Sequence, residues 1–98
     1  MKTEVIFRKF KNTGEIIGIF PYEIWNGSGL CTGYMHVGQH GAADWPLDGT
    51  VAAKPEEYRA LKAELEAIGY DLKVILRRNS KKFEKALREE RKRFSESV

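Results

Sequence analysis

The sequence predicts one α+β domain built on an antiparallel β-meander, with the element order β-β-β-α-β-α. Three observations lead to this fold class. A chain of 98 residues has room for a single core. Its N-terminal third alternates between segments rich in β-branched and aromatic residues and short turns. A stretch beginning at Pro55 instead has apolar residues at helical spacing. We expect that helix to pack on one sheet face, and a basic helix to end the chain.

The expected strands cover residues 4–10, 15–20, 30–37 and 70–77. β-Branched and aromatic side chains dominate the first two segments and favour extended backbone. Asn12 and Gly14 lie between them and tolerate positive φ, which predicts a hairpin turn. The last segment alternates apolar and charged residues, as a strand with one buried face does.

The third expected strand has two different faces. Alternation places Met35 and Val37 toward the core, and Tyr34 and His36 on the opposite side. We expect that opposite side to be the working surface of the protein, unless the last helix covers it. Residues 38–46 contain two glycines and several polar groups, and are typical of a loop.

Both expected helices have recognisable ends. Pro55 suits the first helical position, and the two glutamates after it lie at the positive end of the helix dipole. Gly69 stands where a left-handed cap belongs. Ser80 is the expected N-cap of a last helix that runs to about residue 96. The apolar stripe of this last helix is narrow, so we expect weak docking.

We expect an α+β core, residues 1–78, and a basic C-terminal helix, residues 79–98, either docked or projecting, and the basic charge gathers toward this end of the chain. Residues 1–70 hold seven Lys/Arg and nine Asp/Glu, whereas residues 71–98 hold ten and five. A single cysteine excludes an intramolecular disulfide framework. No apolar run approaches the roughly 20 residues of a membrane span, and no signal-type segment is evident. We expect a cytoplasmic protein with no membrane partner.

Glycines and polar groups concentrate at the end of the third expected strand. Glycine lets a ligand approach the backbone closely, and amide and imidazole groups both donate and accept hydrogen bonds. We therefore predict a site for a small polar ligand, nucleotide-like, or for a host protein. The candidate ligand-binding residues are Tyr34, His36, Gly38, Gln39, His40, Asp44 and Trp45. The alternative is that these groups only close a tight connection.

The basic end of the chain supports a second hypothesis, nucleic-acid binding through phosphate contacts. The candidate residues are Lys73, Arg77, Arg78, Lys81, Lys85 and Arg88. A helical stripe at spacing i, i+4, i+7 and i+11 consists of Lys81, Lys85, Arg88 and Lys92. Glutamates among these cations favour a different interpretation, a solvated helix held by i,i+3 or i,i+4 ion pairs.

A third hypothesis is a small metal-dependent hydrolase that uses His36, His40 or Asp44. Zinc accepts such donors. Cys31 and His36 have opposite strand parity, however, and a glycine loop separates the two histidines, so an ordered tetrahedral site is not expected. We expect binding rather than catalysis, with no catalytic residue, no metal and no cofactor.

The string Y-M-H-V-G-Q-H-G-A-A-D at residues 34–44 resembles a family of short uncharacterised proteins of tailed phages and mobile elements. The similarity covers roughly residues 4–78, a single-domain length, and leaves out the tail from Ser80. This family has no settled activity, so no catalytic role follows from it. The resemblance implies an accessory protein that acts by binding to host machinery, nucleic acid or the nucleotide signals of host defence, alone or as a homodimer.

Overall fold

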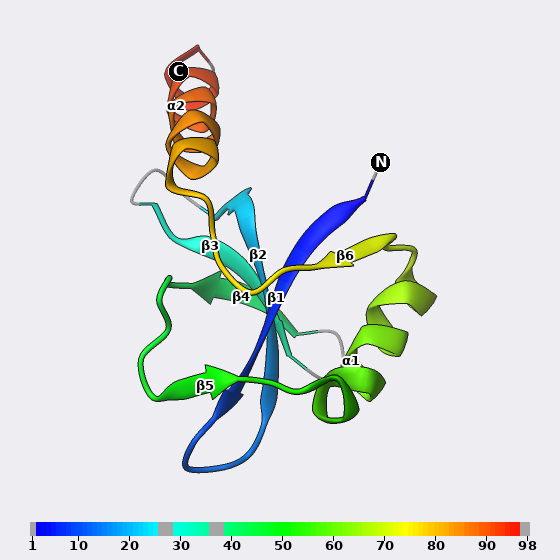
Figure 1. The fold of residues 1–98 in the computed structure, drawn as a ribbon. Helices are drawn as coiled ribbons and strands as arrows, with labels where there is room; N and C mark the ends of the chain where they lie inside the picture. The colour runs from blue at the N-terminus through cyan, green and yellow to red at the C-terminus, as the bar shows by residue number, and fades with distance from the viewer. Residues whose placement is uncertain (1, 26–28, 36–38, 97–98) are drawn as a thin grey trace.

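The computed structural model describes residues 2–25, 29–35 and 39–96, with backbone only at residues 39 and 94–96. Its elements are β1 (Thr3–Phe10), β2 (Ile16–Ile24), β3 (Cys31–Met35), β4 (Gln39–Ala43), β5 (Thr50–Ala52), α1 (Pro55–Ile68), β6 (Leu72–Val74) and α2 (Ser80–Glu96). The predicted α+β class, the meander and both helices are confirmed (Figure 1). The two short strands β4 and β5 add to the four that the sequence predicts.

One sheet contains these strands in the order β4-β3-β2-β1-β5, and β6 also pairs with β1. The pairs β1–β2, β2–β3 and β3–β4 are antiparallel, and their strands follow one another along the chain. β5 pairs antiparallel with the C-terminal half of β1, and β6 pairs parallel with its N-terminal half. A register shift in β2 lies between Phe20 and Ile24, around Pro21, which has no N–H for the ladder. Among the described strands β4 pairs with β3 alone, so β4 is the last strand at its end of the sheet.

The loop predicted for residues 38–46 is wrong over β4, where five residues pair with β3. Gly41, Ala42 and Ala43 have low strand propensity, so their sequence alone does not indicate extended backbone. Their small size suits close packing instead. A Cβ on Gly33 of β3 would lie 3.0 Å from the Cβ of Ala43. Tertiary pairing thus decides the conformation of this segment.

Helix α1 covers one face of the sheet and buries the first cluster beneath it. The first cluster consists of Val5, Phe7, Phe20, Tyr34, Ala53, Leu61, Leu65 and Leu72. Gly18 of β2 allows the close approach, because a Cβ there would lie 3.3 Å from Phe7 and 3.6 Å from Leu65. The Phe7 ring also stacks on Tyr58 of α1, with centroids 4.4 Å apart. Burial of this apolar area is the main force that holds α1 on the sheet.

The ends of α1 agree with the sequence. Pro55 occupies the first turn, and the Glu57 carboxylate accepts hydrogen bonds from the backbone N–H of Lys54 (2.9 Å) and the ammonium of Lys9. The bond from Lys9 is the main cause of a lowered pKa of Glu57. Gly69 ends the helix with φ 127°, a value that side chains other than glycine rarely adopt.

The opposite face of the sheet is covered as well, by connecting segments and by the start of α2. The second cluster consists of Ile6, Ile17, Ile19, Cys31 and Ala43. Trp45 and Leu47 from the β4–β5 connection pack over it, together with Ile75 and Phe83 from the C-terminal part. The sheet therefore has no open face near its centre.

The predicted outward orientation of Tyr34 is wrong. Its side chain is 0% exposed and lies in the first cluster, where its hydroxyl group donates a 2.5 Å hydrogen bond to Glu64 of α1. Met35 packs on the second cluster, on the other side of the sheet. The alternation is as predicted, but α1 packs on the side of Tyr34 and so takes the place of solvent. His36, the other residue expected on that surface, lies outside the described residues.

Candidate functional site

The structure separates the described candidate ligand residues. His40 is exposed on β4, edge-on to the buried Tyr34 with centroids 4.7 Å apart, and its Nε2 lies 3.4 Å from the hydroxyl group of Tyr70. His36 and Gly38 lie outside the described residues. Gln39 begins β4, where its backbone pairs with Met35. The first cluster thus contains Tyr34, and His40 lies at its margin.

Trp45 and Asp44 lie away from that margin. The Trp45 ring packs over the second cluster, and the Arg8 guanidinium lies 5.7 Å from its centroid. Asp44 is exposed, and its Oδ1 accepts a 2.9 Å hydrogen bond from the backbone N–H of Trp45. The described candidates therefore lie on two faces of the sheet. A ligand site built from all of them stays a prediction.

Two residues beside His40 were not singled out by the sequence. Partial burial raises the pKa of Glu23, and the nearby His40 acts in the opposite direction. Burial, and then the charge of Glu23, raises the pKa of Tyr70. The Tyr70 ring stacks on Phe20 at 5.1 Å, which fixes its hydroxyl group near the imidazole. These contacts tie the end of α1 to the sheet margin, and only the three-dimensional pairing of β4 brings them together.

Helix α2 begins at a well-defined anchor. Asn79 is its N-cap: the Asn79 side chain accepts a 3.0 Å hydrogen bond from the backbone N–H of Lys82, which corrects the predicted cap at Ser80. The backbone N–H of Asn79 also donates to the Tyr22 hydroxyl group on β2, at 2.9 Å. The helix start is thereby fixed to the sheet.

Arg78 reinforces this anchor from the inner side. Its guanidinium lies 3.6 Å from the centroid of the Phe83 ring and donates to Cys31 Sγ at 3.6 Å. Burial raises the pKa of the Cys31 thiol, and the hydrogen bond from Arg78 opposes that effect. Arg78 is among the predicted nucleic-acid contacts, but its head group is used inside the protein.

Lys82 is also engaged within the protein. Its ammonium forms an ion pair with Glu4 of β1 at 2.7 Å and lies 4.4 Å from the Tyr22 ring centroid. An exposed pair of this kind contributes at most about 1 kcal/mol. It nevertheless holds one flank of α2 against the sheet, so Lys82 does not belong to the free charge of the helix.

The two sides of α2 differ in charge. Its inner side consists of the partly buried Phe83, Ala86, Leu87 and Glu90. The outer stripe consists of the exposed Lys81, Lys85, Arg88 and Lys92. Since an α-helix turns about 100° per residue, the outer stripe lies about 180° around the helix from the inner side. Within the described chain none of its four cations has an ion pair or hydrogen bond to a side chain. The stripe is therefore an unpaired row of positive charge.

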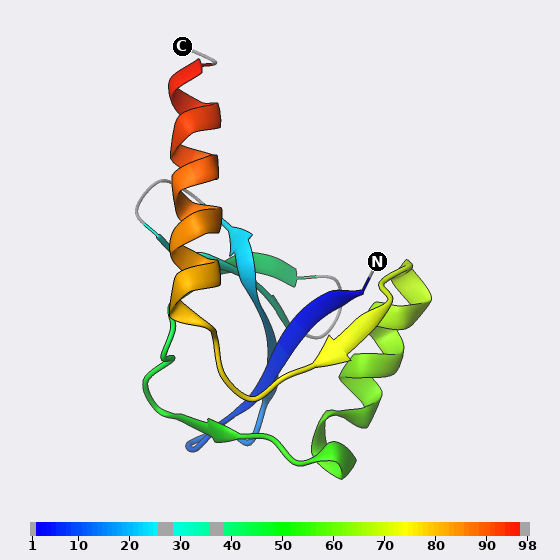
Figure 2. The same cartoon turned by 45° about the horizontal axis from the view of Figure 1, so that its top comes forward.

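The helix also extends beyond the sheet that anchors it. Figure 2 shows α2 rising from the β-sheet, with its C-terminal half well away from α1 and β5. Lys73 and Arg77, the remaining predicted nucleic-acid contacts, are exposed on β6 and on the segment that leads to α2. Positive charge thus continues from the sheet edge to the end of the helix.

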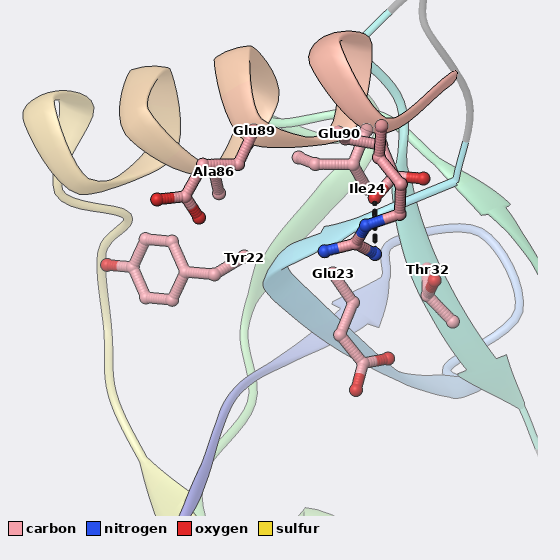
Figure 3. A pocket seen from close by; sticks show the side chains of 8 residues that line it. Tyr22, Glu23, Ile24, Thr32, Ala86, Glu89 and Glu90 are labelled. Atoms are coloured by element: carbon pink, nitrogen blue, oxygen red, sulfur yellow. Dashed lines mark hydrogen bonds and ion pairs between the residues drawn. The ribbon is translucent and has the colours of Figure 1, made fainter. Parts of the chain in front are cut away.

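A groove of about 450 Å³ lies between the inner side of α2 and the ends of β2 and β3 (Figure 3). Its lining consists of Tyr22, Glu23, Ile24, Thr32, Ala86, Glu89, Glu90 and Arg93. The Arg93 guanidinium lies 3.2 Å from Glu90, so the lining carries an excess of carboxylate. Phosphate is repelled from this side, and the outer stripe is the side of α2 that attracts it.

Neither a metal-binding cluster nor a membrane-spanning helix occurs among the described residues. No group of three or more His, Cys, Asp and Glu residues there is placed to hold a metal ion. None of the helices in those residues combines the length and apolar character that crossing a membrane requires.

Comparisons with protein-family models, with curated proteins and with solved structures give no match for this chain. The resemblance to short phage and mobile-element proteins therefore stays a prediction that rests on the residues quoted for it.

Proposed function

We propose that this protein binds nucleic acid through the outer stripe of α2. The observation that carries the proposal is the position of Lys81, Lys85, Arg88 and Lys92, directly opposite the docked side of the helix and without partners in the described chain. A solvated helix held by internal ion pairs was the alternative. That alternative explains Arg93, which pairs with Glu90, but leaves the stripe without a role.

The stripe suits the phosphate backbone rather than base edges. Eleven helical steps from its first to its last cation span roughly 16 Å. Each phosphate that a lysine or arginine neutralises releases condensed counterions and contributes about −0.9 to the slope of log K against log salt on duplex DNA. Four contacts predict a slope of roughly −3 to −4. The stripe has no Asn or Gln for adenine, and we expect little sequence preference.

The surroundings of the stripe support the same function. The acidic groove lies on the inner side of α2, so the field of the helix favours an anion at its outer side alone. Lys73 and Arg77 extend the attraction toward the sheet edge. As part of the proposal, the protein acts in the cytoplasm, and the predicted phage or mobile-element origin is compatible with a nucleic-acid partner.

The test is a binding titration of the full chain against a fluorescent 20-base duplex, a single strand and an RNA of matched length, each over a range of salt. The decisive variant replaces the whole stripe: Lys81→Gln, Lys85→Gln, Arg88→Gln and Lys92→Gln. We expect its affinity to fall more than about tenfold at low salt and its salt slope to approach zero.

The matched control removes the same total charge from the body of the protein, with Lys11→Gln, Lys54→Gln, Arg59→Gln and Lys62→Gln. These side chains lie on the β1–β2 turn and on or beside α1, away from α2. The control is expected to keep most of the affinity and the full salt slope. Equal losses in both variants would show that net charge, and not the stripe, governs binding. Absence of binding by the unmodified chain at low salt would end the proposal.

A further inference from the structure

The outer edge of β4 is open in the described part of the chain. β4 lies at the end of the sheet, and β3 is its neighbour in the ladder. An edge strand presents a row of unpaired N–H and C=O groups, which can pair with a strand from another chain. Proteins usually guard such edges with lysine, proline, bulges or very short strands.

The other edges of this sheet are guarded, whereas β4 is not. β5 and β6 have three residues each, and β6 carries the exposed Lys73. β4 has five residues, Q-H-G-A-A, without a lysine, an arginine, an acidic residue or a proline. Its pairing with β3 runs without a register shift from Met35 to Cys31. β4 is thus a regular and neutral edge.

We propose that two copies of this chain pair through β4, antiparallel and two-fold symmetric, so that their sheets join into one. Symmetry limits the register of this pairing. Hydrogen-bonded and non-hydrogen-bonded residue pairs alternate along an antiparallel ladder, and a two-fold axis can pass only through the centre of one such pair. The axis therefore lies midway between a residue and the same residue of the other copy. The register that pairs all five residues of β4 sets Gly41 opposite Gly41 of the partner subunit.

This register is free of conflict at the side chains that the structure describes. A Cβ on Gly41 would meet no atom within 4 Å, so the centre of the pair is unobstructed within each chain. His40 lies opposite the partner's Ala42, and both are exposed on the α1 side of the sheet. Like charges opposite each other would weaken such a pair, and none occurs here. The neutral, small and self-complementary strand favours a second copy over a charged peptide as the occupant.

The dimer would place both α2 helices on one face. A two-fold axis that relates antiparallel edge strands stands perpendicular to the sheet and keeps the same face upward in both copies. Phe83 docks the start of α2 on the second cluster, opposite α1. Five strand spacings of about 4.8 Å separate the two copies of β2, which puts the helix anchors at least about 24 Å apart. This consequence rests on the proposed function: two outer stripes could engage one nucleic acid and gain avidity.

The test measures self-association without nucleic acid, by sedimentation equilibrium of the full chain from about 1 µM to about 1 mM. Five paired residues make a small interface, so we expect a weak dimer with a Kd of roughly 10–100 µM. The variant Gly41→Lys sets two ammonium groups opposite each other and is expected to weaken the dimer about tenfold. The matched control, Val51→Lys, adds the same charge on β5 and should associate as the unmodified chain does.

Hydrogen exchange keeps the test decisive if Gly41→Lys folds poorly. In the unmodified chain the amides of β4 should exchange more slowly as concentration rises, while those of α1 should not change. A chain that stays monomeric at about 1 mM, or a dimer equally sensitive to Val51→Lys and Gly41→Lys, would refute the interface. A dimer without nucleic-acid binding would leave this inference standing and overturn only the proposed function.

Discussion

Tyr34 links the sheet to α1 through a polar contact inside the first cluster. Its ring is fully buried, and its hydroxyl group donates to the Glu64 carboxylate at 2.5 Å. A hydrogen bond to a charged group is among the stronger ones in a protein. The residue therefore acts in stability, at a position where the sequence predicts a ligand contact.

Removing this hydroxyl group is the residue-scale prediction. Tyr34→Phe keeps the ring but leaves the Glu64 carboxylate without this donor. We expect a loss of about 1.5–3 kcal/mol in the free energy of unfolding, measured by urea denaturation with an unchanged m-value. Tyr58→Phe is a suitable control, because Tyr58 contributes its ring to a stack with Phe7 and has no hydroxyl hydrogen bond in the described chain. Nucleic-acid affinity should stay the same in both variants. If Tyr34→Phe has the same free energy of unfolding as the unmodified chain, the hydroxyl group contributes nothing to the stability of the fold.

The same residue shows how far sequence reasoning reaches. Alternation correctly puts Tyr34 and Met35 on opposite faces, because strand geometry fixes that property locally. Which face α1 covers depends on contacts between distant segments, above all the close approach over Gly18. Both faces of this sheet are covered at its centre, so the fully buried Tyr34 and the partly buried Met35 both pack inside the protein.

At the scale of elements, α2 depends on a few contacts in its first turns. Phe83 packs on the second cluster and beneath the Arg78 guanidinium, while the outer half of the helix extends past the sheet (Figure 1). A helix anchored at one end opens locally at a lower free energy than the core does. The contacts at the start of α2 therefore determine the free energy of local opening of the helix that carries the outer stripe.

The element-scale prediction is that Phe83→Ala loosens α2 without unfolding the sheet. Loss of a half-buried ring and its cation contact should cost about 1–2 kcal/mol, and thus raise local opening roughly 5–30-fold. Trypsin cleavage after Lys81 and Lys82, at low protease concentration, measures that opening. The control Leu76→Ala removes a side chain that is 71% exposed close to the same helix, and should leave cleavage unchanged. Equal cleavage of all three proteins would show that Phe83 is no anchor.

The sequence predicts the helices better than the strands. Proline and glycine mark the ends of α1 by local chemistry, and the spacing of the outer stripe is visible in the sequence alone. β4 and β5 have no such local signal, because Q-H-G-A-A has low strand propensity and three residues are too few to show a period. The anchor of α2 is missed for the same reason, because Tyr22 lies 57 residues before Asn79.

At the scale of the whole molecule, the charge follows the architecture. The sheet and α1 form a body that is close to neutral, and the excess positive charge lies on β6, its following segment and α2. Such a division lets the body fold without strong self-repulsion while the helix attracts polyanions. It also predicts that the body folds without α2.

The last prediction concerns a chain that ends at residue 78. It keeps the six strands, α1 and the first cluster, and it loses Phe83 from the cover of the second cluster. We expect it to unfold cooperatively at a lower Tm than the full chain, with the loss of ellipticity on truncation limited to that of α2. Nucleic-acid binding should disappear, because the whole outer stripe is gone, whereas self-association through β4 should persist. Calorimetry, circular dichroism and the same binding titration check these outcomes. Retained affinity with an unchanged salt slope would place the binding surface on the body of the protein instead of on α2.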